Sequence, residues 1–252
     1  MQKPDELMNR AMEVFAKGFA DTRCYTHPCL AKRVGKLWQV KDGPREKGDY
    51  RREEWIGCGL PPERYQQAAQ KHSITKHVVS AISNVGESDE DLRDGFKALN
   101  YRLGGTEALM VHEMKRIPRA EKPVNIVRVL QQDLADRLNK AAGPRQILPE
   151  HLVKDAPVRQ YVALANDEPI GWVRSHDVEG ASWCANMYVK KEFRRRGIAR
   201  AMMCEMLRDD RKYGSKLAVL TASHAGSHLY PLVGYREIGT LLICTPKKRP
   251  SG

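Results

Sequence analysis

A basic loop that ends in glycine lies between a strand-like segment and a helix-like segment near the C-terminus. Residues 181–189 read as a strand. After the loop 194–197, apolar side chains recur at helical spacing as far as Leu207. A helix between strands, entered through a glycine-containing loop, is typical of α/β folds. The sequence therefore predicts an α/β fold.

The same alternation of patterns continues on both sides of that loop. Two prolines bracket the charged residues of segment 117–123, which has the composition of a connector. We expect a domain boundary there, with domains at residues 1–118 and 119–252. In the second domain the patterns predict strands over 125–129, 158–165, 169–178, 181–189, 216–222 and 235–245, a hairpin turn at 166–168, and helices over 131–142, 197–214 and 225–233.

The first domain is predicted in less detail. Apolar residues at helical spacing predict a helix over 7–19, and no periodicity follows Arg23. Residues 41–54 are polar and contain turn-forming glycine and proline, so we expect a long, mobile, exposed loop. The remaining patterns predict a helix over 61–71, a strand over 75–82, a helix that begins at 88–91 and ends at 100–105, and a strand over 106–114.

Composition narrows the class of protein. The formal net charge of +12 attracts polyanions without saying which. Six scattered cysteines suit reduced thiols, and the absence of a long apolar run or signal-peptide core predicts a cytoplasmic protein that is not membrane-bound. Cys24, His27 and Cys29 lie close together, but no second pair follows at ligand spacing, so we predict no metal.

The basic loop predicts a phosphate site. Gly197 permits close backbone approach, and the following helix leaves its first N–H groups unpaired at the positive end of its dipole. Arg194, Arg195 and Arg196 would add charged donors, with Lys190 and Lys191 behind them. The glycine pattern of dinucleotide-binding loops and the Gly-Lys-Ser/Thr ending of Walker loops are both absent.

A second motif narrows the kind of ligand that this phosphate site would bind. Leu229-Tyr230 is followed by Gly234-Tyr235, and together with the loop Arg194–Ala199 it resembles the GNAT (GCN5-related) N-acetyltransferase superfamily over residues 124–246. The resemblance implies a mixed, splayed central sheet flanked by helices, and acetyl-CoA as co-substrate. It also implies direct attack of a primary amine on the thioester. The N-terminal α/β region is interpreted either as a degenerate GNAT-like half or as an unrelated cap.

The resemblance also implies roles for individual residues. Tyr230 would be the general acid for the leaving thiolate. Trp183 stands where some members carry a glutamate base, so a water-relayed base is favoured. His176, Asp177 and Glu179, which are expected to form a solvated cluster at the turn between two core strands, are weak candidates for the base. The residues expected to bind the cofactor are Met187, Tyr188, Val189, Arg194, Arg195, Arg196, Gly197, Ile198, Ala199, Arg200, Ser223 and Ser227.

Two other classes of function stay open on the sequence alone. One is a non-catalytic acyl-CoA-binding regulator, and the other is a basic nucleic-acid-binding protein, to which the tail 247–249 would contribute. Aromatic residues make up only 7%, and the densest basic cluster is already explained by the phosphate loop, so nucleic acid is the less favoured partner. The acceptor amine and the oligomeric state, a homodimer among the options, are not encoded in any motif.

Overall fold

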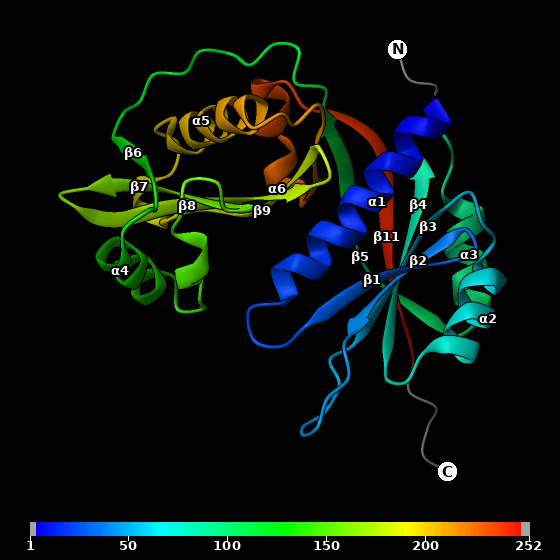
Figure 1. Cartoon of the computed structure of the whole chain (residues 1–252). Helices are drawn as coiled ribbons and strands as arrows, with labels where there is room; N and C mark the ends of the chain where they lie inside the picture. The colour runs from blue at the N-terminus through cyan, green and yellow to red at the C-terminus, as the bar shows by residue number, and fades with distance from the viewer. Residues whose placement is uncertain (1–3, 248–252) are drawn as a thin grey trace. The chain divides into compact units, whose positions relative to one another are not determined.

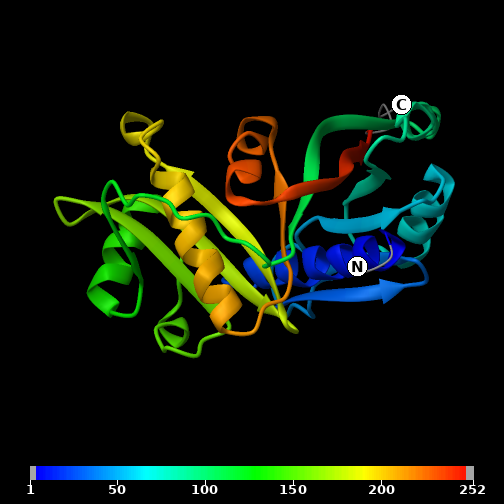
Figure 2. The same ribbon diagram turned by 90° about the horizontal axis from the view of Figure 1, so that it is seen from above.

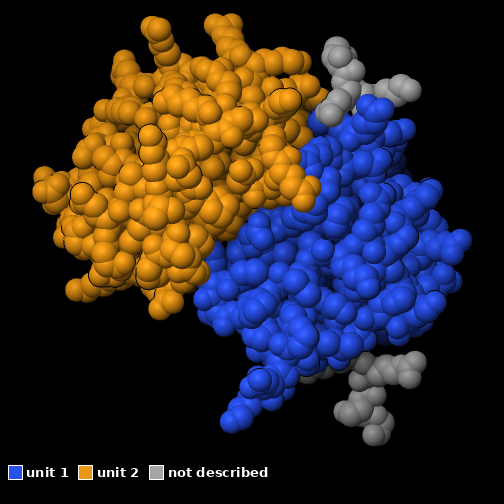
Figure 3. Space-filling view, in the orientation of Figure 1, with its two compact units in different colours: residues 1–110, 221–225, 237–252 blue, residues 111–220, 226–236 orange. Residues whose placement is uncertain are grey.

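The computed structural model describes residues 4–247, which form two compact units (Figures 1 and 3). Of the described residues, 4–110, 221–225 and 237–247 form the first unit, and 111–220 and 226–236 form the second. Lys248 and Arg249 of the predicted basic tail lie outside the described residues. Within residues 4–247, no helix has the length and apolar character needed to cross a membrane.

The first unit contains a six-stranded run in the order β1-β2-β3-β4-β11-β5. Helix α1 packs on one face of this sheet, and α2 and α3 lie on the other (Figure 1). Trp55, Tyr65 and Phe96 are buried in the core beneath α2 and α3. The elements are α1 (Pro4–Arg23), β1 (Cys29–Val34), β2 (Leu37–Asp42), β3 (Glu53–Cys58), α2 (Pro62–His72), β4 (His77–Asn84), α3 (Glu90–Ala98), β5 (Tyr101–His112) and β11 (Arg236–Pro246).

The second unit contains strands in the order β10-β9-β8-β7-β6. Helix α5 crosses one face of β7, β8 and β9, and α4 covers the opposite face, as Figures 1 and 2 show. The elements are β6 (Asn125–Arg128), α4 (Gln132–Ala142), η1 (Pro149–His151), β7 (Val158–Ala165), β8 (Glu168–Val178), β9 (Ala181–Val189), η2 (Lys191–Phe193), α5 (Ile198–Lys212), β10 (Ala218–Ala222), α6 (His224–Ser227) and η3 (Tyr230–Val233).

The predicted α/β fold is confirmed, and nearly every element predicted after residue 119 is present. Asn166 and Asp167 both have positive φ, as the predicted hairpin turn requires. The helix expected over 225–233 is divided into α6 and η3. In the first unit, β5 begins at Tyr101, where the sequence predicted the end of a helix.

The expected loop over 41–54 is shorter in the structure, and the region before it is not irregular. Residues 29–42 form the antiparallel hairpin β1–β2, with Cys29 opposite Asp42, and β3 begins at Glu53. Only one residue of β1 is buried, and its charged residues hide the alternation that a half-buried strand would show.

The two units repeat one order of elements. Strands β1, β2 and β3 are antiparallel neighbours, and β3 is followed by α2 and by the parallel strand β4. Strands β7, β8 and β9 are likewise antiparallel neighbours, followed by α5 and the parallel strand β10. The turn before α2 contains Pro61 and Pro62, which have no N–H to offer a phosphate, whereas the turn before α5 contains Gly197.

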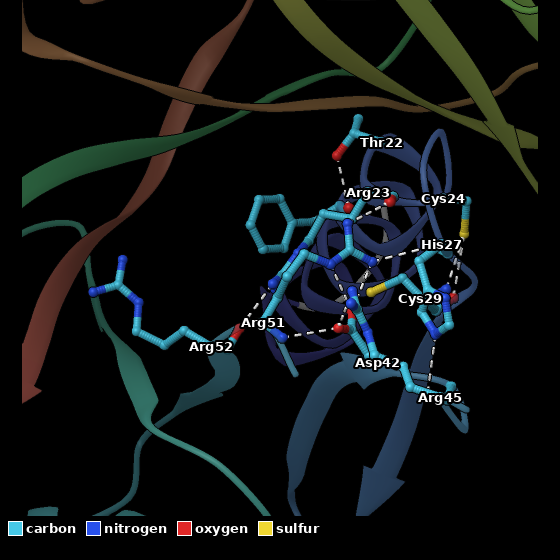
Figure 4. Close-up of polar contacts among 11 residues, drawn as sticks. Thr22, Arg23, Cys24, His27, Cys29, Asp42, Arg45, Arg51 and Arg52 are labelled. Carbon is cyan, nitrogen blue, oxygen red and sulfur yellow. Dashed lines mark hydrogen bonds and ion pairs between the residues drawn. The ribbon is translucent and has the colours of Figure 1, made fainter. Parts of the chain in front are cut away.

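A buried carboxylate paired with two partly exposed arginines closes the loop between β2 and β3 (Figure 4). The Asp42 carboxylate is fully buried and accepts bonds from the Arg51 backbone N–H (2.8 Å) and Nε (2.7 Å), while an Arg45 guanidinium nitrogen lies 2.8 Å away. Arg51 also donates to the carbonyl oxygens of Arg23 (2.6 Å) and His27 (3.1 Å). These contacts tie the loop to the end of α1.

The same region contains the thiols considered for zinc. The Cys29 N–H donates to Cys24 Sγ at 3.2 Å, and burial raises the pKa of both thiols. His27 Nε2 lies 3.2 Å from the Gly43 carbonyl oxygen. Among residues 4–247, no three His, Cys, Asp or Glu side chains form a group that could hold a metal ion, and the six cysteines are free thiols.

Replacing Asp42 by asparagine is expected to lower the free energy of unfolding by about 2 kcal/mol at pH 7. Burial alone would raise the pKa of Asp42, but Arg51 and Arg45 lower it to about 2. A lowered carboxyl pKa stabilises the fold above the unfolded-state value near 4, and this stability is lost as the pH falls through about 2.

Urea unfolding of wild type and Asp42→Asn at pH 7, 4 and 2.5 measures this contribution. The difference in free energy of unfolding should shrink as the pH falls, because protonation removes the charge in the wild type. Asp49→Asn, on the exposed part of the same loop, is the control and should change little. A difference for Asp42→Asn that stays constant with pH would contradict the ion-pair account.

Candidate active site

The loop before α5 is shaped to bind an anion. Arg195 has φ 63° and Gly197 has φ 78°, so the backbone alternates in handedness at this turn. The first helical bond is donated by the Ala201 N–H to the Gly197 oxygen (3.0 Å). Among the described residues, the N–H groups of residues 195–197 make no backbone hydrogen bond, and those of 198–200 precede the first helical bond. Successive unpaired N–H groups at a helix N-terminus form an anion nest.

Two of the three arginines donate hydrogen bonds to backbone oxygens of the residues just before them. Arg194 Nε donates to the Val189 oxygen at 2.8 Å, and its guanidinium lies 5.6 Å from the Tyr188 ring centroid. Arg196 donates to the Glu192 oxygen at 3.0 Å. The sequence predicted all three arginines as phosphate donors. In the structure Arg194 and Arg196 contact the loop's own backbone, and Arg195 is an exposed charge on it.

Strands β9 and β10 diverge beside the loop. Among residues 4–247, they pair only at Ser182 with Ala218 and at Trp183 with Val219. Further along, β9 contains a register irregularity against β8, and Asn186 there has φ 60°. The backbone of Tyr188 and Val189 pairs with β8 on one side and has no β10 partner on the other. This splay leaves one edge of β9 able to pair with an amide-containing ligand.

A buried polar network holds α5 on the sheet. Arg159 of β7 donates from Nε (3.0 Å) and from a terminal nitrogen (2.8 Å) to Asp210 of α5. Ser175 of β8 donates to the same carboxylate at 2.8 Å. Asp210 and Arg159 are both buried, and burial raises the pKa of Asp210 against the opposing effect of Arg159. The network fixes the axis of the helix whose N-terminus carries the anion nest.

Tyr230 lies at the first position of η3 and is buried. Its ring meets the Tyr235 ring edge-on, with centroids 5.8 Å apart. The Tyr235 backbone N–H donates to the backbone carbonyl oxygen of Tyr230 at 3.1 Å, and this bond closes the turn through Gly234. Burial raises the pKa of Tyr235 well above its ordinary value, so Tyr235 is a neutral packing residue. The motif Leu229-Tyr230 and Gly234-Tyr235 is therefore one folded turn.

The three candidate bases do not form the solvated turn cluster that the sequence indicated. His176 is inside β8 opposite Trp183, only 1% exposed, and burial lowers its pKa well below the ordinary value. Asp177 and Glu179 are exposed, and Glu179 with φ 51° forms the turn to β9. His176 and Asp177 therefore lie on opposite faces of β8, and Glu179 lies beyond the end of that strand.

Ser223 and Ser227 belong to different compact units. Ser223 follows β10 in the first unit, and Ser227 ends α6 in the second. Their cofactor contacts remain a prediction from the resemblance.

Sequence reasoning did not find the Arg159–Asp210 pair or the register irregularity at Asn186, because neither has a local pattern. A charged residue within an otherwise apolar strand, such as Arg159 near the start of β7, was the one available signal.

The segment before β6 is fastened to α5. Arg208 donates to the Pro118 oxygen at 2.8 Å, and Lys122 lies 2.9 Å from Glu205. Arg211 of α5 lies 3.4 Å from the Met114 oxygen. The segment 117–123, which read as a connector in the sequence, is therefore held against α5, and Figure 2 shows it crossing that helix.

Comparisons with known proteins agree with this geometry. Residues 157–237 match the family model described as acetyltransferase (GNAT) domain. A GCN5-related N-acetyltransferase from Kribbella flavida is similar in structure, with TM-score 0.62, 15% identity and 96% of each chain covered. One from Sphaerobacter thermophilus has TM-score 0.57 and 17% identity, with 99% of this chain and 95% of that chain covered.

A tandem GNAT protein from the clavulanic acid biosynthesis pathway is also similar, with TM-score 0.51, 12% identity and coverage of 87% of this chain and 82% of that chain. No curated protein sequence matches the chain. The predicted GNAT-type mixed sheet flanked by helices is confirmed by these structures, and the GNAT resemblance is confirmed by the family model.

Proposed function

We propose, on the premise that residues 157–237 form a GNAT acetyltransferase domain, that the protein transfers the acetyl group of acetyl-CoA to a primary amine. The observation that carries the proposal is the row of unpaired N–H groups from Arg195 to Arg200 beside a splayed strand pair. The nest would bind the pyrophosphate, and the free edge of β9 at residues 187–189 would pair with the amide-containing arm.

In the proposed reaction, the unprotonated amine nitrogen attacks the thioester carbonyl carbon directly. The carbon–sulfur bond breaks, and the sulfur takes a proton from the Tyr230 hydroxyl. The amine loses its proton to a base, and the phenol regains one through solvent. His176 is buried and Asp177 and Glu179 are solvated, so we favour a proton path through water.

The first unit repeats the order of the elements without an anion nest, because prolines occupy the turn before α2. We propose that it is a degenerate GNAT-like half that does not bind acetyl-CoA. The domain division between residues 118 and 119, which the sequence predicted, belongs to this proposal. Under it, one molecule of the chain binds one molecule of acetyl-CoA.

Tyr230→Phe is expected to lower kcat by about 100-fold and to change KM for acetyl-CoA little, because only the proton donor is removed. The measurement is acetyl-CoA-dependent release of free thiol over a panel of primary amines, polyamines and peptides. Tyr213→Phe, an exposed tyrosine at the end of α5, is the control. Tight binding of acetyl-CoA without turnover of any amine would support a non-catalytic acyl-CoA-binding regulator instead.

A further inference from the structure

A buried histidine lies against the turn that carries Tyr230. His112, at the end of β5, is 2% exposed and belongs to the second unit together with residues 226–236. Its Nδ1 accepts the Met114 N–H at 2.9 Å. Its ring meets the Tyr235 ring edge-on, with centroids 5.4 Å apart. His112 therefore connects the start of the second unit to the Tyr230–Tyr235 turn.

The imidazole occupies space that only glycine leaves open. Gly234 has φ 100°, and a Cβ there would lie 2.7 Å from His112 Nε2. The same Cβ would lie 3.4 Å from the Arg116 oxygen. Since Gly234 is the residue through which Tyr235 closes back onto Tyr230, the Nε2 edge of His112 supports the turn from its inner side.

The protonation state of His112 is defined by its contacts. Because Nδ1 accepts a backbone N–H, the proton of the neutral ring is on Nε2. Burial lowers the pKa of His112, the backbone of Arg116 and Val233 acts in the opposite sense, and the charge of Arg211 on α5 acts with burial. His112 is therefore uncharged at neutral pH, with Nδ1 facing the Met114 N–H and Nε2 facing Gly234.

We propose that His112 is a positioning residue that holds the Tyr230 hydroxyl in its orientation for proton transfer, acting through Gly234 and Tyr235. The inference rests on the proposed acetyltransferase function. The His112 ring contacts Met114, the Gly234–Tyr235 turn and the backbone of Arg116 and Val233, and none of these residues belongs to the anion nest or to β9. Its loss should therefore change the chemical step and leave cofactor affinity unchanged.

Two amide substitutions test the Nδ1 edge and the Nε2 edge of the imidazole separately. Asparagine at position 112 places an oxygen near the Nδ1 site and retains an acceptor for the Met114 N–H, but it removes the Nε2 edge. Glutamine places its amide nitrogen near the Nε2 site and loses that acceptor. We expect His112→Asn to lower kcat about tenfold and His112→Gln about twofold, each with KM for acetyl-CoA within about twofold of wild type. A purely structural role through Met114 would reverse this order, and that result would overturn the inference.

A double-mutant cycle tests whether the effect passes through Tyr230. In the Tyr230→Phe background, His112→Asn should change kcat by less than about twofold, because the group that it positions is gone. The same tenfold loss in both backgrounds would overturn the inference. Leu138→Ala, which opens the core on the α4 face of the sheet, controls for lost stability and should give no such coupling.

A readout without turnover distinguishes failure of the inference from failure of the proposed function. If wild type binds acetyl-CoA and no amine is acetylated, the proposed function fails. Amide hydrogen exchange of residues 230–235 then decides on His112. Exchange should be faster in His112→Asn than in Leu138→Ala at equal global stability. Equal exchange in the two variants would overturn the support of the turn by His112.

Discussion

Acetyl-CoA binding is expected to weaken about 1000-fold in Gly197→Glu, which corresponds to about 4 kcal/mol. Gly197 has φ 78° and forms the N-cap of α5, between the unpaired N–H groups of Arg195 and Arg200. A side chain there strains the left-handed backbone, and a carboxylate placed in the nest repels the pyrophosphate. Several charge-assisted hydrogen bonds, each contributing about 1.5–3 kcal/mol, would be lost together.

The chain provides a matched control at the other end of the same helix. Gly214 has φ 92° and is exposed, and at Gly214, as at Gly197, an added Cβ would meet no atom within 4 Å. Gly214→Glu therefore imposes a similar backbone strain and the same charge, away from the nest. Calorimetric titration with acetyl-CoA should show the loss for Gly197→Glu alone. Equal affinities of both variants would refute the assignment of the phosphate site.

The sequence predicted the second unit well for a physical reason. Its strands are buried and mostly apolar, as in β7 and β8, and α5 presents an amphipathic pattern, so each element is encoded locally. The loop before α5 was found because glycine and arginine at a strand–helix junction have direct consequences for backbone geometry and charge. A resemblance to GNAT proteins then joined this loop to the Tyr230 turn.

The parts that were missed depend on contacts between distant segments. The hairpin β1–β2 gains its order from α1 and from the Asp42–Arg51 pair, and its own residues alternate weakly. The role inferred for His112 depends on its contacts with Gly234 and Tyr235, which are more than 100 residues away in the sequence, so no local pattern indicates it. His176 read as part of a turn because a strand end cannot be placed to within a residue or two from sequence.

Asp210→Asn is expected to destabilise the protein by about 3–5 kcal/mol, because it leaves the buried Arg159 guanidinium without its counter-charge. Arg159 is 2% exposed, and its guanidinium carbon also lies 5.0 Å from the centroid of the Tyr213 ring, which carries no charge to replace that of Asp210. Ser175 would also lose a charged acceptor. Urea unfolding at pH 7 measures the loss as a lower transition midpoint at unchanged slope.

The neighbouring carboxylate is the control for this prediction. Asp209 is partly exposed and accepts a bond from the Tyr161 hydroxyl at 3.0 Å, so Asp209→Asn should cost only about 1 kcal/mol. A double substitution, Arg159→Met with Asp210→Leu, removes both charges and should regain most of the stability lost in Asp210→Asn. If Asp210→Asn cost no more than Asp209→Asn, the buried pair would not be what holds α5. The orientation of the anion nest would then have to depend on apolar packing alone.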